Sequence, residues 1–102
     1  MPKGYILASV AVEDADAYTA YTSRTPDIIA KHGGRFIVRG GTVTPLEGEM
    51  ALKGRLVVIE FPSVEAAKGW YDCAEYQEII PLRTAASQGA LVLLEGFDPP
   101  EV

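Results

Sequence analysis

The 102-residue sequence has a single cysteine, a single histidine and no long apolar segment. The lone Cys73 excludes an internal disulfide and a metal site built from several cysteines, and the lone His32 excludes a multi-histidine metal site. No apolar run approaches the ~20 residues that a transmembrane helix needs. The first residues, Met-Pro-Lys-Gly-Tyr-Ile, also lack the pattern of a signal peptide. We therefore expect a cytoplasmic protein that does not insert into membranes.

Basic residues are in the minority, with nine lysines and arginines against fourteen acidic residues and a formal net charge of -5. The basic residues are scattered along the chain, whereas binding to nucleic-acid phosphates needs a basic face. The glycine pairs in "HGGRF" and "RGG" lack the spacing of a nucleotide-binding loop. We expect no nucleic-acid partner, no metal and no cofactor.

Hydrophobic residues make up 48% of the chain, enough for one core at this length. Strand patterns cover residues 3–12, 35–39, 55–61 and 90–96. Helical patterns lie between them, over residues 14–32 and 63–87. The order β-α-β-β-α-β predicts an α+β fold of the ferredoxin-like type, with an antiparallel four-stranded sheet and both helical regions on one face. We expect one domain over residues 1–97 and a flexible tail over residues 98–102.

Start and stop signals subdivide both helical regions. Asp14 and Ser63 are expected N-caps, and Gly33 suits the left-handed position after a helix. Pro26 would begin a new turn with Thr25 as its cap, and Pro81 would kink or restart the second region.

Alternation along the strands divides their side chains into two faces. One set has no polar member and is assigned to the side of the helices: Ile6, Ala8, Val10, Phe36, Val38, Val57, Ile59, Phe61, Val92 and Leu94. The other set has polar ends and an apolar centre formed by Leu7, Ile37, Val58 and Leu93. An exposed apolar centre is typical of an interface, so we expect a homodimer formed across this face. The alternative is that the connection over residues 42–54 covers it.

The second and third strands should form an antiparallel pair, because they are consecutive and joined by a loop. Matching the two faces sets Arg35 opposite Glu60, Ile37 opposite Val58 and Arg39 opposite Leu56. This register predicts an ion pair between Arg35 and Glu60 and leaves Arg39 without that partner.

Three segments, "KHGGRFIVRGG" at 31–41, "VVIEFPSVEAAKGWYDCAEYQEI" at 57–79 and "LVLLEG" at 91–96, resemble the small bacterial family called domain of unknown function 1330. The resemblance covers nearly the whole chain. It implies the dimeric α/β-barrel superfamily, in which two ferredoxin-like sheets face each other. Cys73 departs from the family pattern, where serine is more typical, which argues against a catalytic thiol. The resemblance implies no particular activity.

Six residues are candidates for ligand binding: His32, Arg39, Glu60, Tyr71, Tyr76 and Arg83. Histidine transfers protons near neutral pH, but His32 sits where it would complement a helix C-terminus. Arginine binds carboxylates with a planar pair of donors, or pairs with an acid of the chain itself. A carboxylate beside buried surface can act as a base, although an ion pair is the simpler role. The two tyrosines are hydroxyl donors or core residues.

Two functions remain open. The first is a dimeric domain that binds a small molecule, or a cofactor-independent enzyme acting on a small organic carboxylate or aromatic substrate. The second is a non-catalytic structural or regulatory interaction module. A pocket holding at least two of the six candidates would favour the first, and a filled core would favour the second.

Overall fold

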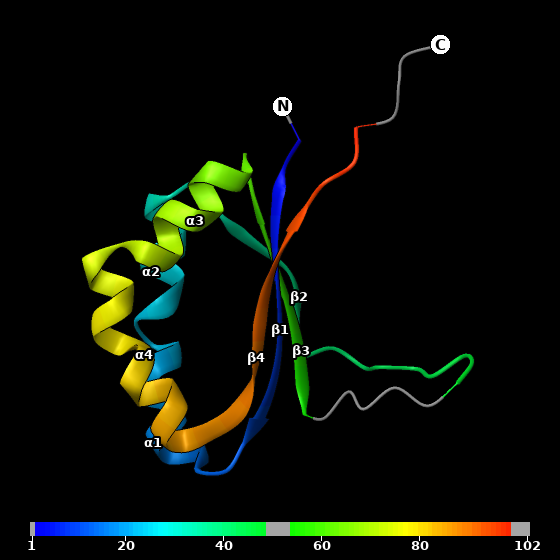
Figure 1. The fold of residues 1–102 in the computed structure, drawn as a ribbon. Coiled ribbons are helices and arrows are strands. Elements are labelled where there is room, and N and C mark those ends of the chain that lie inside the picture. Colours follow the sequence, from blue (N-terminus) through cyan, green and yellow to red (C-terminus); the bar gives the residue numbers. More distant parts are fainter. Residues whose placement is uncertain (1, 49–53, 99–102) are drawn as a thin grey trace.

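The computed structural model describes residues 2–48 and 54–98, and places a four-stranded sheet against a layer of helices (Figure 1). The elements are, in chain order, β1 (Gly4–Val12), α1 (Ala15–Thr22), α2 (Thr25–Lys31), β2 (Arg35–Arg39), β3 (Arg55–Phe61), α3 (Val64–Asp72), α4 (Ala74–Ala86) and β4 (Ser87–Glu95). The strands lie in the order β2-β3-β1-β4, and every neighbouring pair is antiparallel. In Figure 1 all helices lie on one side of the sheet. The ferredoxin-like prediction is confirmed.

The expected N-caps are present at the starts of α1 and α3. The Asp14 carboxylate accepts a hydrogen bond from the Ala17 amide at 3.0 Å, and the Ser63 hydroxyl accepts one from the Ala66 amide at the same distance. These bonds satisfy amide groups that have no partner inside the helix. After α2, Gly33 adopts a φ of 77°, which a residue without a Cβ does at low cost.

Two expected helix boundaries were wrong. Thr25 does not cap α2, because it is the first residue of that helix and its hydroxyl donates to the Tyr21 carbonyl at 2.6 Å. The second helical region does not restart at Pro81, which lies inside α4. The break falls at Cys73, whose sulfur accepts a hydrogen bond from the Tyr76 amide at 3.4 Å and so caps α4.

The assignment of β4 to the two faces was also wrong. β1 and β3 orient as expected, since Ile6, Ala8 and Ile59 are buried beneath the helices. In β4, however, Leu91 pairs with Ala8 and Leu93 with Ile6, so these two leucines face the helices. Val92 and Leu94 are 47% exposed on the opposite side. Residues 90–94 are all apolar, and no polar side chain marks the phase of the strand.

A bulge in β2 corrects the predicted register. Arg35 lies opposite Glu60 as expected, and its Nη2 is 3.0 Å from the Glu60 carboxylate, so the ion pair is confirmed. Beyond Phe36 the pairing shifts by one residue, which sets Val38 opposite Val58 and Arg39 opposite Val57. A bulge inserts one residue into a strand and reverses the faces of those that follow. Arg39 therefore faces the helices instead of the opposite side.

The face of the sheet away from the helices is called here the open face. Its apolar centre consists of Leu7, Val38, Val58, Val92 and Leu94. Figure 1 shows the described part of the connection after β2, residues 41–48, extending away from the sheet and not lying across this face. The expected tail lies, apart from Asp98, outside the described residues.

We expect Gly34→Ala to destabilise the protein. A Cβ at residue 34 would lie 2.5 Å from Phe61 Cε1 and 2.7 Å from Ile29 Cγ2, and both side chains are buried. Such overpacking costs about 1–3 kcal/mol. The matched control is Gly41→Ala, because a Cβ there meets no atom within 4 Å. Urea denaturation should show a lower midpoint for the first variant and almost no change for the second; equal midpoints would contradict the packing described.

Candidate functional site

A pocket lies between the sheet and the helices, and three arginines from separate elements line it. Arg39 ends β2, Arg55 begins β3 and Arg83 lies in α4. We call it the arginine pocket. Its volume is about 50 Å³, and its remaining lining is apolar or uncharged: Ile6, Ala8, Val10, Tyr18, Tyr21, Thr22, Thr25, Phe36, Val57, Ile59, Trp70 and Leu91. None of the described residues that line this pocket is acidic.

Local backbone features bring the first two arginines into place. The β2 bulge turns Arg39 toward the helices, where its guanidinium carbon stacks 4.3 Å from the centre of the Phe36 ring. Arg55 packs beside Gly40, which has a φ of 69°. A Cβ at residue 40 would come within 2.8 Å of Arg55 Nε, so glycine leaves the room that this guanidinium occupies.

The basic residues of the pocket form no ion pair with the described residues, and the same holds for Lys68 outside it. Among the described residues, the ion pairs join Lys3 and Arg35 to Glu60, Arg24 to Glu78 and Lys31 to Glu75. Arg39, Arg55 and Arg83 form no ion pair within this part of the chain. Three like charges therefore converge without a counter-charge from the described residues.

Two residues that line the pocket each carry a buried nitrogen that has no hydrogen-bond partner among the described residues. These nitrogens are Nε1 of Trp70 and Nε of Arg83. Both groups can only donate, so each needs an acceptor. Buried polar atoms without partners are rare in proteins, because each loses the free energy of its hydration.

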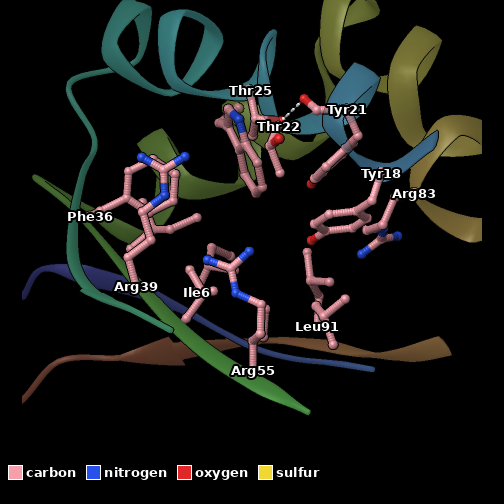
Figure 2. Close-up of a pocket in the computed structure, with 15 residues that line it drawn as sticks. Ile6, Tyr18, Tyr21, Thr22, Thr25, Phe36, Arg39, Arg55, Arg83 and Leu91 are labelled. Carbon is pink, nitrogen blue, oxygen red and sulfur yellow. Dashed lines mark hydrogen bonds between the residues drawn. The ribbon is translucent and has the colours of Figure 1, made fainter. Parts of the chain in front are cut away.

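Two tyrosines of α1 direct their hydroxyls toward the same space as Arg55 (Figure 2). Burial raises the pKa of the Tyr18 hydroxyl, and the positive charges of the arginines oppose that rise without cancelling it. Burial likewise raises the pKa of Tyr21, whose hydroxyl lies 2.7 Å from that of Tyr76. Both hydroxyls are therefore neutral at physiological pH and can donate to an anion.

The six residues proposed from sequence fall into three groups. Arg39 and Arg83 line the pocket, and Tyr76 lies behind it, fully buried and bonded to Tyr21. Tyr71 is 38% exposed and lines an adjacent groove. The remaining two lie elsewhere and are described next.

Glu60 and His32 are not part of the pocket. Glu60 faces the open side of the sheet: partial desolvation raises its carboxylate pKa, but the hydrogen bonds and charges of Arg35 and Lys3 outweigh this and lower it overall. Such a carboxylate is a weak base. His32 ends α2, and its Nδ1 lies 3.1 Å from the Ile28 carbonyl.

Four residues of the pocket were not proposed from sequence: Tyr18, Tyr21, Arg55 and Trp70. Arg55 had a usable signal, because it is in phase with Val57, Ile59 and Phe61 on the side assigned to the helices. A charged residue in phase with a buried face marks a site. Within residues 2–48 and 54–98, no group of three or more histidine, cysteine, aspartate or glutamate side chains is arranged to hold a metal ion, and no helix could cross a membrane.

Comparisons with known proteins agree with this fold. The model of a family described as a domain of unknown function, DUF1330, matches residues 3–97. This chain belongs to that family. No curated protein matches the sequence.

Solved structures resemble the DUF1330 chain over nearly its whole length. RPA0582 of Rhodopseudomonas palustris, described as a protein of unknown function, is 23% identical with a TM-score of 0.76, over 96% of this chain and 85% of that one. SnoaB of Streptomyces nogalater, described as a cofactor-independent oxygenase, is 14% identical with a TM-score of 0.61, over 100% and 97%. Rv0793 of Mycobacterium tuberculosis is 18% identical with a TM-score of 0.56, over 99% and 100%. At these identities the likeness establishes the fold alone.

The tyrosine pair behind the pocket gives a testable asymmetry. Tyr21→Phe leaves the fully buried Tyr76 hydroxyl without its partner and should destabilise the protein by about 1–3 kcal/mol. Tyr76→Phe should cost less, because the Tyr21 hydroxyl it leaves behind borders the pocket. The double variant should cost less than the sum of the two, as measured by thermal and urea unfolding. Strict additivity would contradict a direct bond between the hydroxyls.

Proposed function

We propose that this domain binds a small organic anion in the arginine pocket, with a carboxylate or phenolate as the group recognised. The observation that carries the proposal is that Arg39, Arg55 and Arg83 line one pocket, with no acidic residue among its described lining residues. A guanidinium group presents planar pairs of N–H donors that match the two oxygens of a carboxylate. It also keeps its positive charge at physiological pH. An anion would supply the counter-charge.

The neutral donors support the same ligand. The indole nitrogen of Trp70 needs an acceptor, and the hydroxyls of Tyr18 and Tyr21 can each donate. A ligand rich in oxygen acceptors would satisfy these groups and the arginines together. The Phe36 and Trp70 rings and the aliphatic side chains of β1 and β3 would contact the carbon atoms next to the recognised group.

An enzymatic role on a small carboxylate or aromatic substrate is a further step of the same proposal. Donors fixed in place before the substrate arrives stabilise negative charge that develops on an oxygen during reaction. The arginines and tyrosines offer such donors to an enolate or phenolate without a cofactor. The alternative, a purely structural or regulatory module, offers no reason to gather unpaired arginines inside the fold.

Trp70 reports on this pocket because it is the one tryptophan of the sequence. We expect phenylacetate to change its fluorescence, and the neutral isostere phenylacetamide to have little effect. Arg39→Met and Arg55→Met should each weaken phenylacetate binding by about tenfold or more, as expected for a charged hydrogen bond. Arg35→Met is the matched control, since Arg35 lies on the same strand as Arg39 but faces the open side. Equal binding of acid and amide, or no difference between the arginine variants and the control, would refute the proposal.

We also propose that the domain forms a homodimer through the open face. Its apolar centre is substantially exposed, with Val38 at 42% and Val92 and Leu94 at 47%. A contiguous apolar patch on a sheet is typical of an interface. The segment after β2 adds Val43 and Leu46, exposed on the part of the chain that extends from the sheet, where a second copy would meet it (Figure 1).

Sedimentation equilibrium at micromolar concentration should give twice the chain mass of 11.0 kDa. Val58→Asp, at the centre of the open face, should shift the protein to the monomer, because it would place a charge in an apolar contact. Ala20→Asp, on an exposed helix position, should leave the dimer intact. A monomeric wild-type protein would disprove this mode of association.

A further inference from the structure

The arginine pocket is too small for a whole aromatic acid. Its volume is about 50 Å³. A water molecule takes up about 30 Å³ in the liquid, and a cavity that binds benzene has a volume of about 150 Å³. The pocket can therefore hold a carboxylate group, but the rest of a larger ligand must lie outside it.

A second cavity continues from the pocket and supplies that room. It is a groove of about 310 Å³ between α3 and β4, lined on one side by Ala67, Lys68, Tyr71 and Asp72 and on the other by residues 89–93. Ile6, Arg83 and Leu91 line both the pocket and the groove. We call it the β4 groove.

Arg83 marks the junction between the two spaces. Its side chain extends from α4, and its buried Nε has no hydrogen-bond partner. A carboxylate beside Arg83 would accept hydrogen bonds from its guanidinium group and lie in the pocket that Arg39 and Arg55 also line. Its carbon chain would then leave past Leu91 into the groove.

The walls of the β4 groove suit an apolar chain that ends near solvent. Leu91 and Leu93 point toward the helices and form one wall, and Ala67 forms part of the other. Tyr71 also lines the groove; the residue is 38% exposed, and its ring contacts the rings of Trp70 and Tyr76. An aromatic ring at the end of a short chain could pack against Tyr71.

We propose that the ligand is an elongated organic acid: its carboxylate occupies the arginine pocket, and its apolar body lies along the β4 groove as far as Tyr71. This rests on the proposed function, to which it adds the length and polarity of the ligand and a second binding region. The arginines of the pocket would select ligands that carry an acid group, and the β4 groove would select those that also carry an apolar chain.

A series of acids of increasing length tests the assignment, with calorimetry and Trp70 fluorescence as readouts. Acetate should bind weakly, phenylacetate more tightly and 4-phenylbutyrate most tightly, with a gain of about tenfold or more across the series, because each further buried methylene adds affinity. The amide of 4-phenylbutyrate should bind far more weakly than the acid.

Variants separate the two regions. Tyr71→Ala should weaken 4-phenylbutyrate binding severalfold and leave acetate binding unchanged, whereas Arg55→Met should weaken both. Glu65→Ala, on the same helix but outside both cavities, is the matched control. Thermal unfolding of each variant establishes that the fold is retained.

The outcomes distinguish this inference from the proposed function. If affinity does not rise with chain length, or if Tyr71→Ala leaves 4-phenylbutyrate binding unchanged, the groove assignment is wrong; arginine-dependent binding of the short acids would still uphold the proposed function. If no acid binds in an arginine-dependent way, both proposals fail.

Discussion

The antiparallel pairing of β1 with β3 decides which side chains face the helices, and the site follows from it. Ile6 pairs with Ile59 and Ala8 with Val57, so apolar residues of both central strands lie beneath the helix layer. The same phase carries Arg55, two residues before Val57 and opposite Val10, to that side. A shift of one residue would expose every one of these apolar side chains and is therefore excluded. An arginine beneath the helices is thus a direct consequence of the register that buries the core.

Aromatic residues of the helices cover the apolar side chains of β1 and β3. Trp70 and Tyr76 stack with ring centres 4.1 Å apart, and Tyr21 bonds to Tyr76, so the donors facing the pocket are held by packing behind them. Rigid donors keep their orientation when an anion binds and need little reorganisation. The break between α3 and α4 at Cys73 contributes, because it caps the helix that carries both Tyr76 and Arg83. In this position the thiol serves as a helix cap, because its sulfur accepts a hydrogen bond from the Tyr76 amide.

The order of strands and helical regions along the chain and the pairing of Arg35 with Glu60 could be predicted, because each depends on local patterns or on consecutive strands. The β2 bulge could not, since Ile37 and Val38 are both apolar and the sequence does not show which of them lies opposite Val58; both are exposed in the structure. Residues 90–94 of β4 are likewise all apolar, so their alternation does not show which side chains face the helices. These two ambiguities account for the main errors in the site: Arg39 was chosen as a ligand residue from the wrong face, and Leu93 was assigned to the interface although it lies beneath the helices. Tyr18, Tyr21 and Trp70 resemble core residues by spacing, and only their arrangement in space reveals a shared pocket.

The distribution of charge gives the pocket its selectivity. The chain carries a net charge of -5, and the ion pairs among its described residues place Glu60, Glu75 and Glu78 against basic residues outside the pocket. The three arginines that line the pocket therefore form a positive region on a negatively charged molecule, with Arg39 exposed and Arg55 and Arg83 partly exposed. An anion would gain affinity there from the attraction of these charges and from charge-assisted hydrogen bonds. A neutral molecule of the same shape gains neither, so charge is expected to dominate the selection of the ligand, and shape to refine it.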